Sequence, residues 1–278
     1  MADFLDCAGR RLDLTTPQVM GVLNVTPDSF SDGGQFVTPD AAVAHARRMA
    51  EEGAAIIDVG GESTRPGAAP VSVEEELRRV IPVIEAVAAE VPVVISIDTR
   101  KAAVMRAAVA AGAGMINDVC ALQEEDALEA AAQLKVPVCL MHMQGEPRTM
   151  QAEPHYEDVV AEITTFLAAR AAMCERAGIP RERLLIDPGF GFGKALEHNL
   201  QMLKHLADFR ALGLPMVVGV SRKSLIGAVL DVPAAQRLYG SIALAALAVW
   251  QGAALIRAHD VAATVEAIKM VNAVIKSR

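Results

Sequence analysis

Polar side chains follow almost every apolar run in this sequence, at the point where the run ends. Asn24 ends the first run, Asp98 the third, and Asp187 opens the stretch DPGFGFGK at 187–194. Other runs end in Ser63, Thr64 and Arg65; Asn117 and Asp118; His142; Ser221, Arg222 and Lys223; and Arg257 and His259. A single acid or amide in such a place usually caps a helix or forms a turn. Their recurrence after so many runs predicts that they converge on one site.

These polar groups fall into two chemical halves. Asp98, Asn117 and Asp187 offer acceptors and an amide, which suit a flat, neutral heterocycle with several N–H donors. A buried carboxylate can accept two bonds from an amino-pyrimidinone edge, and each charge-assisted bond contributes about 1.5–3 kcal/mol. The other half offers cations and hydroxyl donors, which suit one or two phosphates: Arg65, Ser221, Lys223, Arg257 and His259. One half therefore predicts ring recognition, and the other predicts a phosphate site.

Three loop segments add to this interpretation. DPGFGFGK is not a phosphate loop of the GxxxxGK[ST] type, because Pro188 stands where the first glycine belongs. The segments 24–34 and 60–68, both rich in Gly and Pro, resemble lids, and two lids suggest a second substrate that binds after the first. No HExxH-type metal cluster is present, but a divalent ion could arrive with the phosphates and bind the amide oxygen of Asn24.

The scaffold must bring many strand ends together. Eight apolar runs of strand length occur at 19–25, 54–60, 92–98, 114–119, 137–143, 183–189, 215–221 and 254–260. Each run is followed by a helical segment, and roughly 30 residues per unit suit a strand plus a crossover helix. Continuously apolar strands are typical of parallel strands covered on the outside. We therefore predict an α/β fold, a (β/α)8 TIM barrel, with its chemistry at the carboxyl ends of the strands. A doubly wound open sheet is the alternative.

The chain shows no Gly/Ser-rich linker or break in composition, so we predict one barrel domain at 19–278. We expect residues 1–18 to form a short hairpin that closes the barrel floor. The helix around 242–250 is apolar on all faces, and only one side of it can pack on the barrel. Its other side therefore predicts the contact of a homodimer.

Two helix starts carry clear signals. Ser72 with Glu75 three residues later is a capping-box pattern. Thr38 followed by Pro39 predicts an N-cap and a first helical position, and Gly53 predicts the end of that helix.

Composition argues against several classes of protein. A net charge of −8 disfavours a nucleic-acid or acidic-membrane partner. The four cysteines form no CxxC pair, which indicates reduced thiols and a cytoplasmic location. The N-terminus has acids and no apolar run, so it is not expected to be a signal peptide. The most apolar stretch, 241–256, has 16 residues, whereas roughly 20 are needed to span a bilayer.

The motifs together resemble the bacterial dihydropteroate synthases, pterin-binding enzymes that sulfonamides target. In family order the matching stretches are MGVLNVTPDSFSDGG, GGESTRPGA, SIDTRK, INDV, LMHMQGEPRTMQ, DPGFGFGK, GVSRKS and RAHD. The resemblance implies a transferase of folate biosynthesis. Such an enzyme condenses 6-hydroxymethyl-7,8-dihydropterin diphosphate with para-aminobenzoate and releases diphosphate with Mg²⁺.

The resemblance also implies roles for individual residues. It places pterin diphosphate on Thr64, Asp98, Asn117, Asp187, Lys223, Arg257, Ala258 and His259. It places para-aminobenzoate, less firmly, on Pro27, Phe30, Arg65, Phe192, Ser221 and Lys223, and Mg²⁺ on Asn24. The predicted catalytic residues are Asp98, Lys223, Arg257 and His259, which would stabilise the charges that develop as diphosphate leaves. Ala258 stands where a larger aliphatic residue is commoner in the family.

Two other functions compete with this one. A pterin-binding methyltransferase on the same barrel handles a ligand without diphosphate, so it would not need the cations Lys223, Arg257 and His259. A non-catalytic pterin-binding or scaffold subunit would be expected to lose lid or metal residues, whereas Asn24 and Arg65 are both present.

Overall fold

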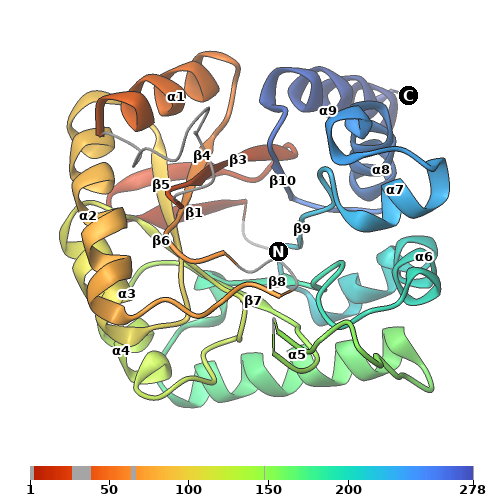
Figure 1. Ribbon diagram of the computed structural model, residues 1–278, viewed down its shortest axis with the longest axis horizontal. Helices are drawn as coiled ribbons and strands as arrows, with labels where there is room; N and C mark the ends of the chain where they lie inside the picture. Colours follow the sequence, from red (N-terminus) through yellow and green to blue (C-terminus); the bar gives the residue numbers. More distant parts are fainter. Residues whose placement is uncertain (1–2, 27–38, 64–66, 147, 278) are drawn as a thin grey trace.

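Eight parallel strands form the centre of the molecule in the computed structural model, which describes residues 3–26, 39–63, 67–146 and 148–277. Their order in the sheet is β8-β7-β6-β5-β4-β3-β10-β9, and a parallel bridge between Ile186 and Met216 joins the two edges. The strands are β3 (Gln18–Asn24), β4 (Ile56–Gly60), β5 (Val94–Asp98), β6 (Met115–Asp118), β7 (Val138–Met141), β8 (Leu184–Asp187), β9 (Val217–Val218) and β10 (Leu255–Ala258). The predicted (β/α)8 barrel is confirmed, and the open doubly wound sheet is excluded (Figure 1).

Helices follow the strands and surround the sheet (Figure 1). They are α1 (Pro39–Glu51), α2 (Val73–Glu90), α3 (Ala102–Ala110), α4 (Ala127–Leu134), α5 (Val159–Arg176), α6 (Leu196–Lys204), α7 (Ser224–Leu230), α8 (Leu238–Trp250) and α9 (Val261–Lys276). Short 3-10 turns lie at η1 (Arg181–Arg183), η2 (Leu206–Leu212) and η3 (Ala234–Gln236). The Ser72 hydroxyl accepts a bond from the Glu75 amide at 3.2 Å, which confirms the N-cap of α2. Pro39 begins α1 as predicted, while Thr38 lies outside the described residues.

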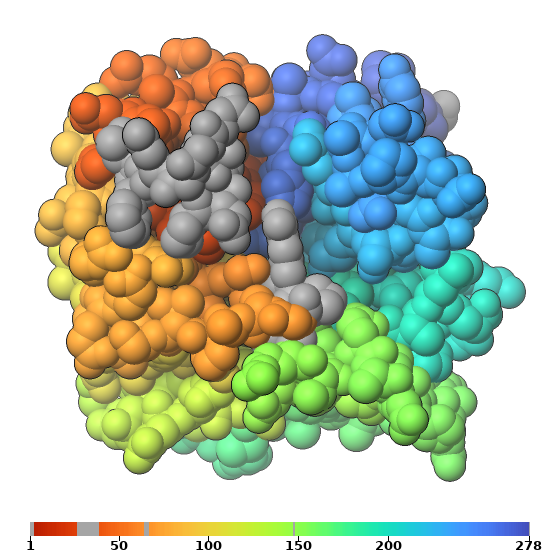
Figure 2. All heavy atoms as spheres, in the orientation of Figure 1, coloured from red at the N-terminus to blue at the C-terminus, as the bar shows by residue number. Residues whose placement is uncertain are grey.

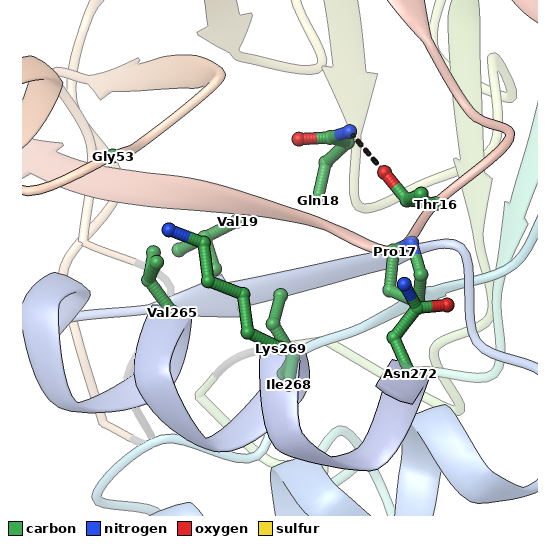
Figure 3. Close-up of a pocket in the computed structure, with 9 residues that line it drawn as sticks. All are labelled: Thr16, Pro17, Gln18, Val19, Gly53, Val265, Ile268, Lys269 and Asn272. Atoms are coloured by element: carbon green, nitrogen blue, oxygen red, sulfur yellow. Dashed lines mark hydrogen bonds between the residues drawn. The ribbon is translucent and has the colours of Figure 1, made fainter. Parts of the chain in front are cut away.

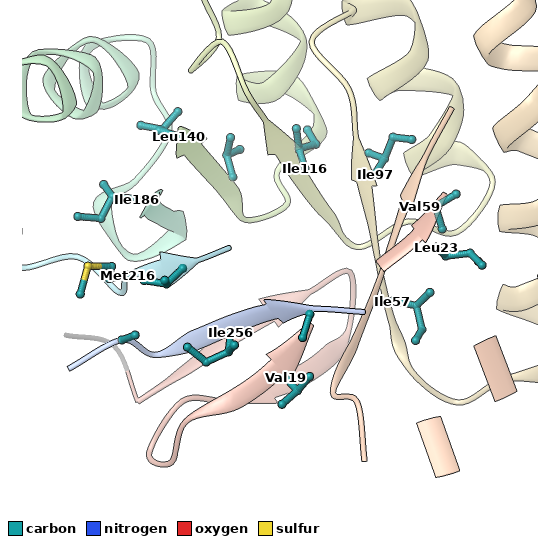
Figure 4. Close-up of a cluster of buried hydrophobic side chains, with 14 of the residues drawn as sticks. Val19, Leu23, Ile57, Val59, Ile97, Ile116, Leu140, Ile186, Met216 and Ile256 are labelled. Atoms are coloured by element: carbon teal, nitrogen blue, oxygen red, sulfur yellow. The ribbon is translucent and has the colours of Figure 1, made fainter. Parts of the chain in front are cut away.

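Side chains that point outward from the strands join the helices in the main hydrophobic core (Figure 4). They include Val19, Leu23, Ile57, Val59, Ile97, Ile116, Leu140, Ile186, Met216 and Ile256. Because successive side chains of a strand alternate between faces, the residues between them point into the barrel. The barrel interior is therefore lined by a second and separate set of residues.

Near the start of the strands this interior set is apolar and buried. It comprises Met20, Ile56, Val94, Met115, Cys139, Leu185, Val217 and Leu255. The hairpin of β1 (Phe4–Cys7) and β2 (Arg10–Asp13) packs against it through Leu5, Cys7 and Leu12. A Cβ on Gly114 would lie 2.6 Å from the carbonyl oxygen of Cys7, so only glycine lets the hairpin approach β6 this closely. The predicted N-terminal hairpin is present.

One strand is much shorter than its sequence pattern predicts. The apolar run 215–221 gives regular pairing only at Val217–Val218. Pro215 has no backbone N–H to donate, so regular pairing cannot extend back through it. The adjoining Met216 forms the isolated bridge to Ile186 that closes the barrel, and its carbonyl accepts from the Ala254 and Leu255 amides.

The four cysteines form no disulfide, and three of them, Cys7, Cys139 and Cys174, are buried. These three pack in the hydrophobic clusters of the barrel. Across the described ranges no helix combines the length and apolar character needed to cross a membrane.

Candidate active site

Strand ends place four predicted site residues, Asn24, Asp98, Asn117 and Asp187, at one end of the barrel. Asn24 is paired with Gly60, Gly60 with Asp98, and Asp98 with Asn117. Asp187 ends β8 beside Met141 of β7. Because all these strands are parallel, their carboxyl ends share one rim of the barrel. Figure 2 shows the surface of the molecule in the orientation of Figure 1. The segments that follow β4 (orange) and β7 (green) lie beside the centre of this face.

Arg257 is held at this rim by two acids. Its Nε lies 2.6 Å from Asp58 Oδ2, and one Nη lies 2.8 Å from Asp98 Oδ2. The Asn117 side-chain amide also donates to Asp58 Oδ2, at 3.1 Å. Asp58 is fully buried, with 0% exposure, and both bonds go to its Oδ2, which compensates part of the solvation that its charge has lost. Its Oδ1 has no hydrogen-bond partner among the described residues. The result is one network across β4, β5, β6 and β10.

Burial sets the electrostatics of this network. It raises the pKa of Asp98 to about 7, although the nearby Arg257 charge acts in the opposite direction. Burial also opposes the charge of Arg257, but Asp58 and Asp98 raise the pKa of the guanidinium above its ordinary value. Arg257 is thus a fixed cation. Asp98 is a carboxyl whose ionisation a ligand can change, because N–H donors favour the charged form.

Asp187 and Lys223 form the adjoining part of the rim. The Asp187 carboxylate accepts a bond from the Gly189 amide at 2.7 Å, and burial raises its pKa while Lys223 opposes the rise. Lys223 donates to the Phe190 carbonyl, and its ammonium lies 4.4 Å from the centre of the Phe192 ring. Burial lowers the pKa of Lys223 to about 8, against the attraction of Asp187. This lysine therefore interacts with both the Asp187 carboxylate and the Phe192 ring.

Ser221 and His259 meet at the ends of neighbouring segments. The His259 amide donates to the Ser221 hydroxyl at 3.2 Å, and His259 Nδ1 lies 3.1 Å from the same oxygen. His259 is exposed, so its ring is open to a ligand. The Ala258 side chain, in contrast, belongs to the outer hydrophobic core, so a ligand at the rim can meet only its backbone.

The side-chain oxygen of Asn24 lies at the rim near that of Asp98, where a metal ion could bind. A Cβ on Gly60 would come within 3.7 Å of both Asn24 Oδ1 and Asp98 Oδ2, so the missing side chain leaves these oxygens flanking one gap. No group of three or more acids, histidines or cysteines in the described ranges could hold a metal ion by itself. The donor set fits an ion that receives most of its ligands from phosphate and water, as Mg²⁺ commonly does.

Four predicted site residues, Pro27, Phe30, Thr64 and Arg65, lie outside the described residues. The structure adds Asp58, which the sequence analysis did not select. Asp58 stands in the middle of the apolar run 54–60 and not at its end. The sequence does distinguish Asp58, because it is the only charged residue in that apolar run.

A separate pocket of about 280 Å³ lies far from the rim along the strands (Figure 3). It is lined by Thr16, Pro17, Gln18, Val19, Gly53, Val265, Ile268, Lys269 and Asn272. Gln18 begins β3 and Gly53 precedes β4, so the pocket is at the amino ends of these strands. It contains none of the rim residues.

The chain matches the family model described as pterin binding enzyme over residues 20–259. It is 57% identical over 270 residues to the dihydropteroate synthase of Escherichia coli strain K12, covering 97% of this chain and 96% of that protein. A Yersinia pestis dihydropteroate synthase solved with a sulfonamide drug complex has a TM-score of 0.95 and 54% identity, over 99% of this chain and 100% of that one. A Xanthomonas albilineans dihydropteroate synthase in complex with 7,8-dihydropteroate has a TM-score of 0.91 and 54% identity, again over 99% and 100%. The chain therefore belongs to the pterin-binding enzyme family, among its dihydropteroate synthases.

Proposed function

We propose that this rim condenses 6-hydroxymethyl-7,8-dihydropterin diphosphate with para-aminobenzoate to give 7,8-dihydropteroate and diphosphate. The observation that carries the proposal is the meeting of buried acids with buried cations at one end of the barrel. Asp187 lies near Lys223, and Asp98 binds Arg257 at 2.8 Å. A ring with N–H donors and an anionic tail needs both kinds of group next to each other.

The ring binds to the acid side of the rim. Asp187 and Asp98 can accept from ring N–H and amino groups, and Asn117 offers both an amide donor and an acceptor. Because these side chains are buried or nearly so, their bonds to the ring form in a site that excludes most water. Burial raises the pKa of both acids, so a ligand that donates to them also favours their ionised form.

The reaction replaces one bond at the pterin methylene carbon with another. The C–O bond to diphosphate breaks and its electron pair leaves with the oxygen, while the aniline nitrogen forms the new C–N bond and then releases a proton. Arg257, Lys223 and His259 can stabilise the departing anion, and Asp98 can stabilise positive charge on the pterin. Correct placement of the aniline contributes roughly 7–11 kcal/mol. No side-chain nucleophile is needed, so no covalent enzyme intermediate forms.

Mg²⁺ is the proposed metal, with Asn24 as its protein ligand. When bound, it supplies positive charge to the diphosphate oxygens. The support from this chain is the amide oxygen of Asn24, which flanks the same gap as Asp98. The para-aminobenzoate pocket is proposed to include Phe192, Ser221 and Lys223, together with Pro27, Phe30 and Arg65 from the segments outside the described residues. The cytoplasmic location stays a prediction from the sequence.

A homodimer is proposed through the faces of α7, α8 and α9 that no other described element covers. Large apolar side chains are exposed there: Val229, Leu230, Tyr239, Leu247, Trp250, Met270, Val274 and Ile275. Isolated exposed apolar residues are ordinary, but a group of this size on neighbouring helices is typical of an association surface.

The function is tested by measuring diphosphate release from the pterin diphosphate with and without para-aminobenzoate. We expect release to depend on para-aminobenzoate and to match the amount of 7,8-dihydropteroate formed. Release without any condensed product, or no release under any condition, would refute the proposed reaction. The measurement also distinguishes it from methyl transfer, which yields no diphosphate.

Activity should fall in alkaline solution as Lys223 loses its proton. The pKa of Lys223 is lowered to about 8, so its positive charge is present below pH 8 and lost above it. We expect kcat/KM for the pterin diphosphate to fall above pH 8 by about ten-fold per pH unit. Lys223→Arg should move this decline to higher pH, and Lys223→Ala should weaken binding and turnover together. An unchanged alkaline limb in Lys223→Arg would remove this residue from the explanation.

Replacing Asp58 should impair the site without changing any group that faces the ligand directly. Asp58→Asn leaves Arg257 with one carboxylate partner, and hydrogen bonds between charged groups contribute about 1.5–3 kcal/mol, so kcat/KM should fall about 10- to 100-fold. Ser96→Ala is the matched control, because Ser96 is the register partner of Asp58 and its hydroxyl has no partner among the described residues. Steady-state kinetics that place both variants within two-fold of the wild type, a threshold on the order of RT, would contradict this assignment.

Dimer formation can be followed through the single tryptophan. Trp250 is 60% exposed in the isolated chain, so burial in a dimer should shift its fluorescence emission to shorter wavelength. We expect the emission to move back toward that of exposed tryptophan on dilution, together with a fall in mass by light scattering. Leu247→Glu should give the monomer at all concentrations. A wild-type chain that is monomeric throughout would exclude this interface.

A further inference from the structure

Side chains hold the backbone of the loop 187–194 at nearly every residue. The Asn199 side-chain oxygen accepts from the Gly191 amide at 2.7 Å, and the Tyr156 hydroxyl donates to the Gly193 carbonyl at 2.9 Å. Gln151 donates to the Gly191 carbonyl, and Lys223 to the Phe190 carbonyl. A loop with three glycines, each free to adopt many conformations, is therefore held in a single one.

Two of these glycines allow direct contact with the segment after β7. A Cβ on Gly189 would lie 1.9 Å from the His142 carbonyl oxygen, and one on Gly193 would lie 2.2 Å from that of Gln144. Both glycines also have positive φ, 73° and 63°, which other residues rarely adopt. The side of the loop at Gly189 and Gly193 thus packs against the backbone of His142 and Gln144, and the opposite side faces the rim.

Lys194 lies behind the loop and is only 2% exposed. Its Nζ lies 2.9 Å from the Phe192 carbonyl, 3.0 Å from His142 Nδ1 and 3.3 Å from the His142 carbonyl. Burial lowers the pKa of Lys194 well below its ordinary value, and the nearby charge of Lys223 lowers it further. Even the neutral amine keeps two N–H donors for these three acceptors. Burial lowers the pKa of His142 to about 3, so its ring is neutral and Nδ1 can accept. No group in the proposed mechanism requires this lysine.

The two lysines bind alternate carbonyls of the same loop. Lys223 takes the carbonyl of Phe190 at the rim, and Lys194 takes that of Phe192 from behind. Lys223 must also serve the substrates, so its bond to the loop competes with ligand binding. Lys194 is buried behind the loop, so a ligand at the rim does not compete for its bond.

We propose that Lys194 is a positioning residue for the second substrate: by fixing the Phe192 carbonyl, it keeps the Phe192 ring beside the ammonium of Lys223. The proposal rests on the function above, which assigns Phe192 and Lys223 to para-aminobenzoate. It predicts a defect in the binding of that substrate, with the pterin side of the rim left intact.

The test compares Lys194→Met with Lys204→Met, a control at an exposed lysine of α6. We expect Lys194→Met to raise KM for para-aminobenzoate about ten-fold or more, with KM for the pterin diphosphate and kcat changed about two-fold at most. Lys194→Gln, which keeps a donor, should show a smaller effect. Kinetics of Lys194→Met equal to those of the control would overturn the proposal. An inactive wild type would instead refute the proposed function.

A spectroscopic measurement separates positioning from general loss of structure. Fluorine NMR of the full chain with 4-fluorophenylalanine at position 192 should show a shifted or broadened signal in Lys194→Met. The same label at Phe209, a fully buried core residue, should show no change. An unchanged signal at position 192 would overturn the proposal. Failure of both Lys194 variants to fold would assign the residue to barrel stability and would overturn it as well.

Discussion

The buried contact of Arg257 with Asp58 and Asp98 is the constraint on which the rest of the site depends. One guanidinium binds two carboxylates, at 2.6 and 2.8 Å, in a barrel interior that offers little water. Removing one member of such a buried pair commonly costs 3–5 kcal/mol, at the order-of-magnitude level, because the remaining charge has no partner. Asn117 donates to the same Asp58 oxygen, so the proposed ring-binding and diphosphate-binding residues share one support. A change at Asp58 is therefore expected to affect both.

The barrel makes this arrangement possible by separating two kinds of interior. Near the strand starts, the inward side chains are apolar and are covered by the hairpin residues Leu5 and Leu12. Toward the strand ends, the inward positions become Asp58, Asp98 and Asp187. The apolar layer excludes water from below, and the outer core fixes the strands from outside. The chemistry thus occupies the one part of the barrel that does not have to contribute to its hydrophobic core.

Sequence patterns predicted this fold because a parallel barrel strand is apolar on both faces for most of its length. Every predicted apolar run contains a strand of the sheet, and the ends that carry Asp98, Asn117 and Arg257 do converge in one network. Other run ends do not join it: Asp118 accepts from the Cys120 and Leu122 amides, His142 lies against Lys194, and Arg222 pairs with Asp260. Asp58 was not predicted, because it stands inside an apolar run and the predicted site residues stand at the ends of such runs. Lys194 was not predicted either, since a lysine after a glycine-rich loop is usually exposed. Only the folded structure shows that it is buried and that its Nζ contacts His142 and Phe192.

The backbone and the side chain of Ala258 face different parts of the fold. Its backbone lies at the rim between Arg257 and His259, while its methyl group packs into the core shared with the surrounding helices. Side-chain size at this position is therefore a matter of how tightly the sheet and its helical coat fit together, and the ligand does not meet it. A larger aliphatic side chain at this position would therefore change how the sheet packs against its helices and would leave the polar groups of the rim in place.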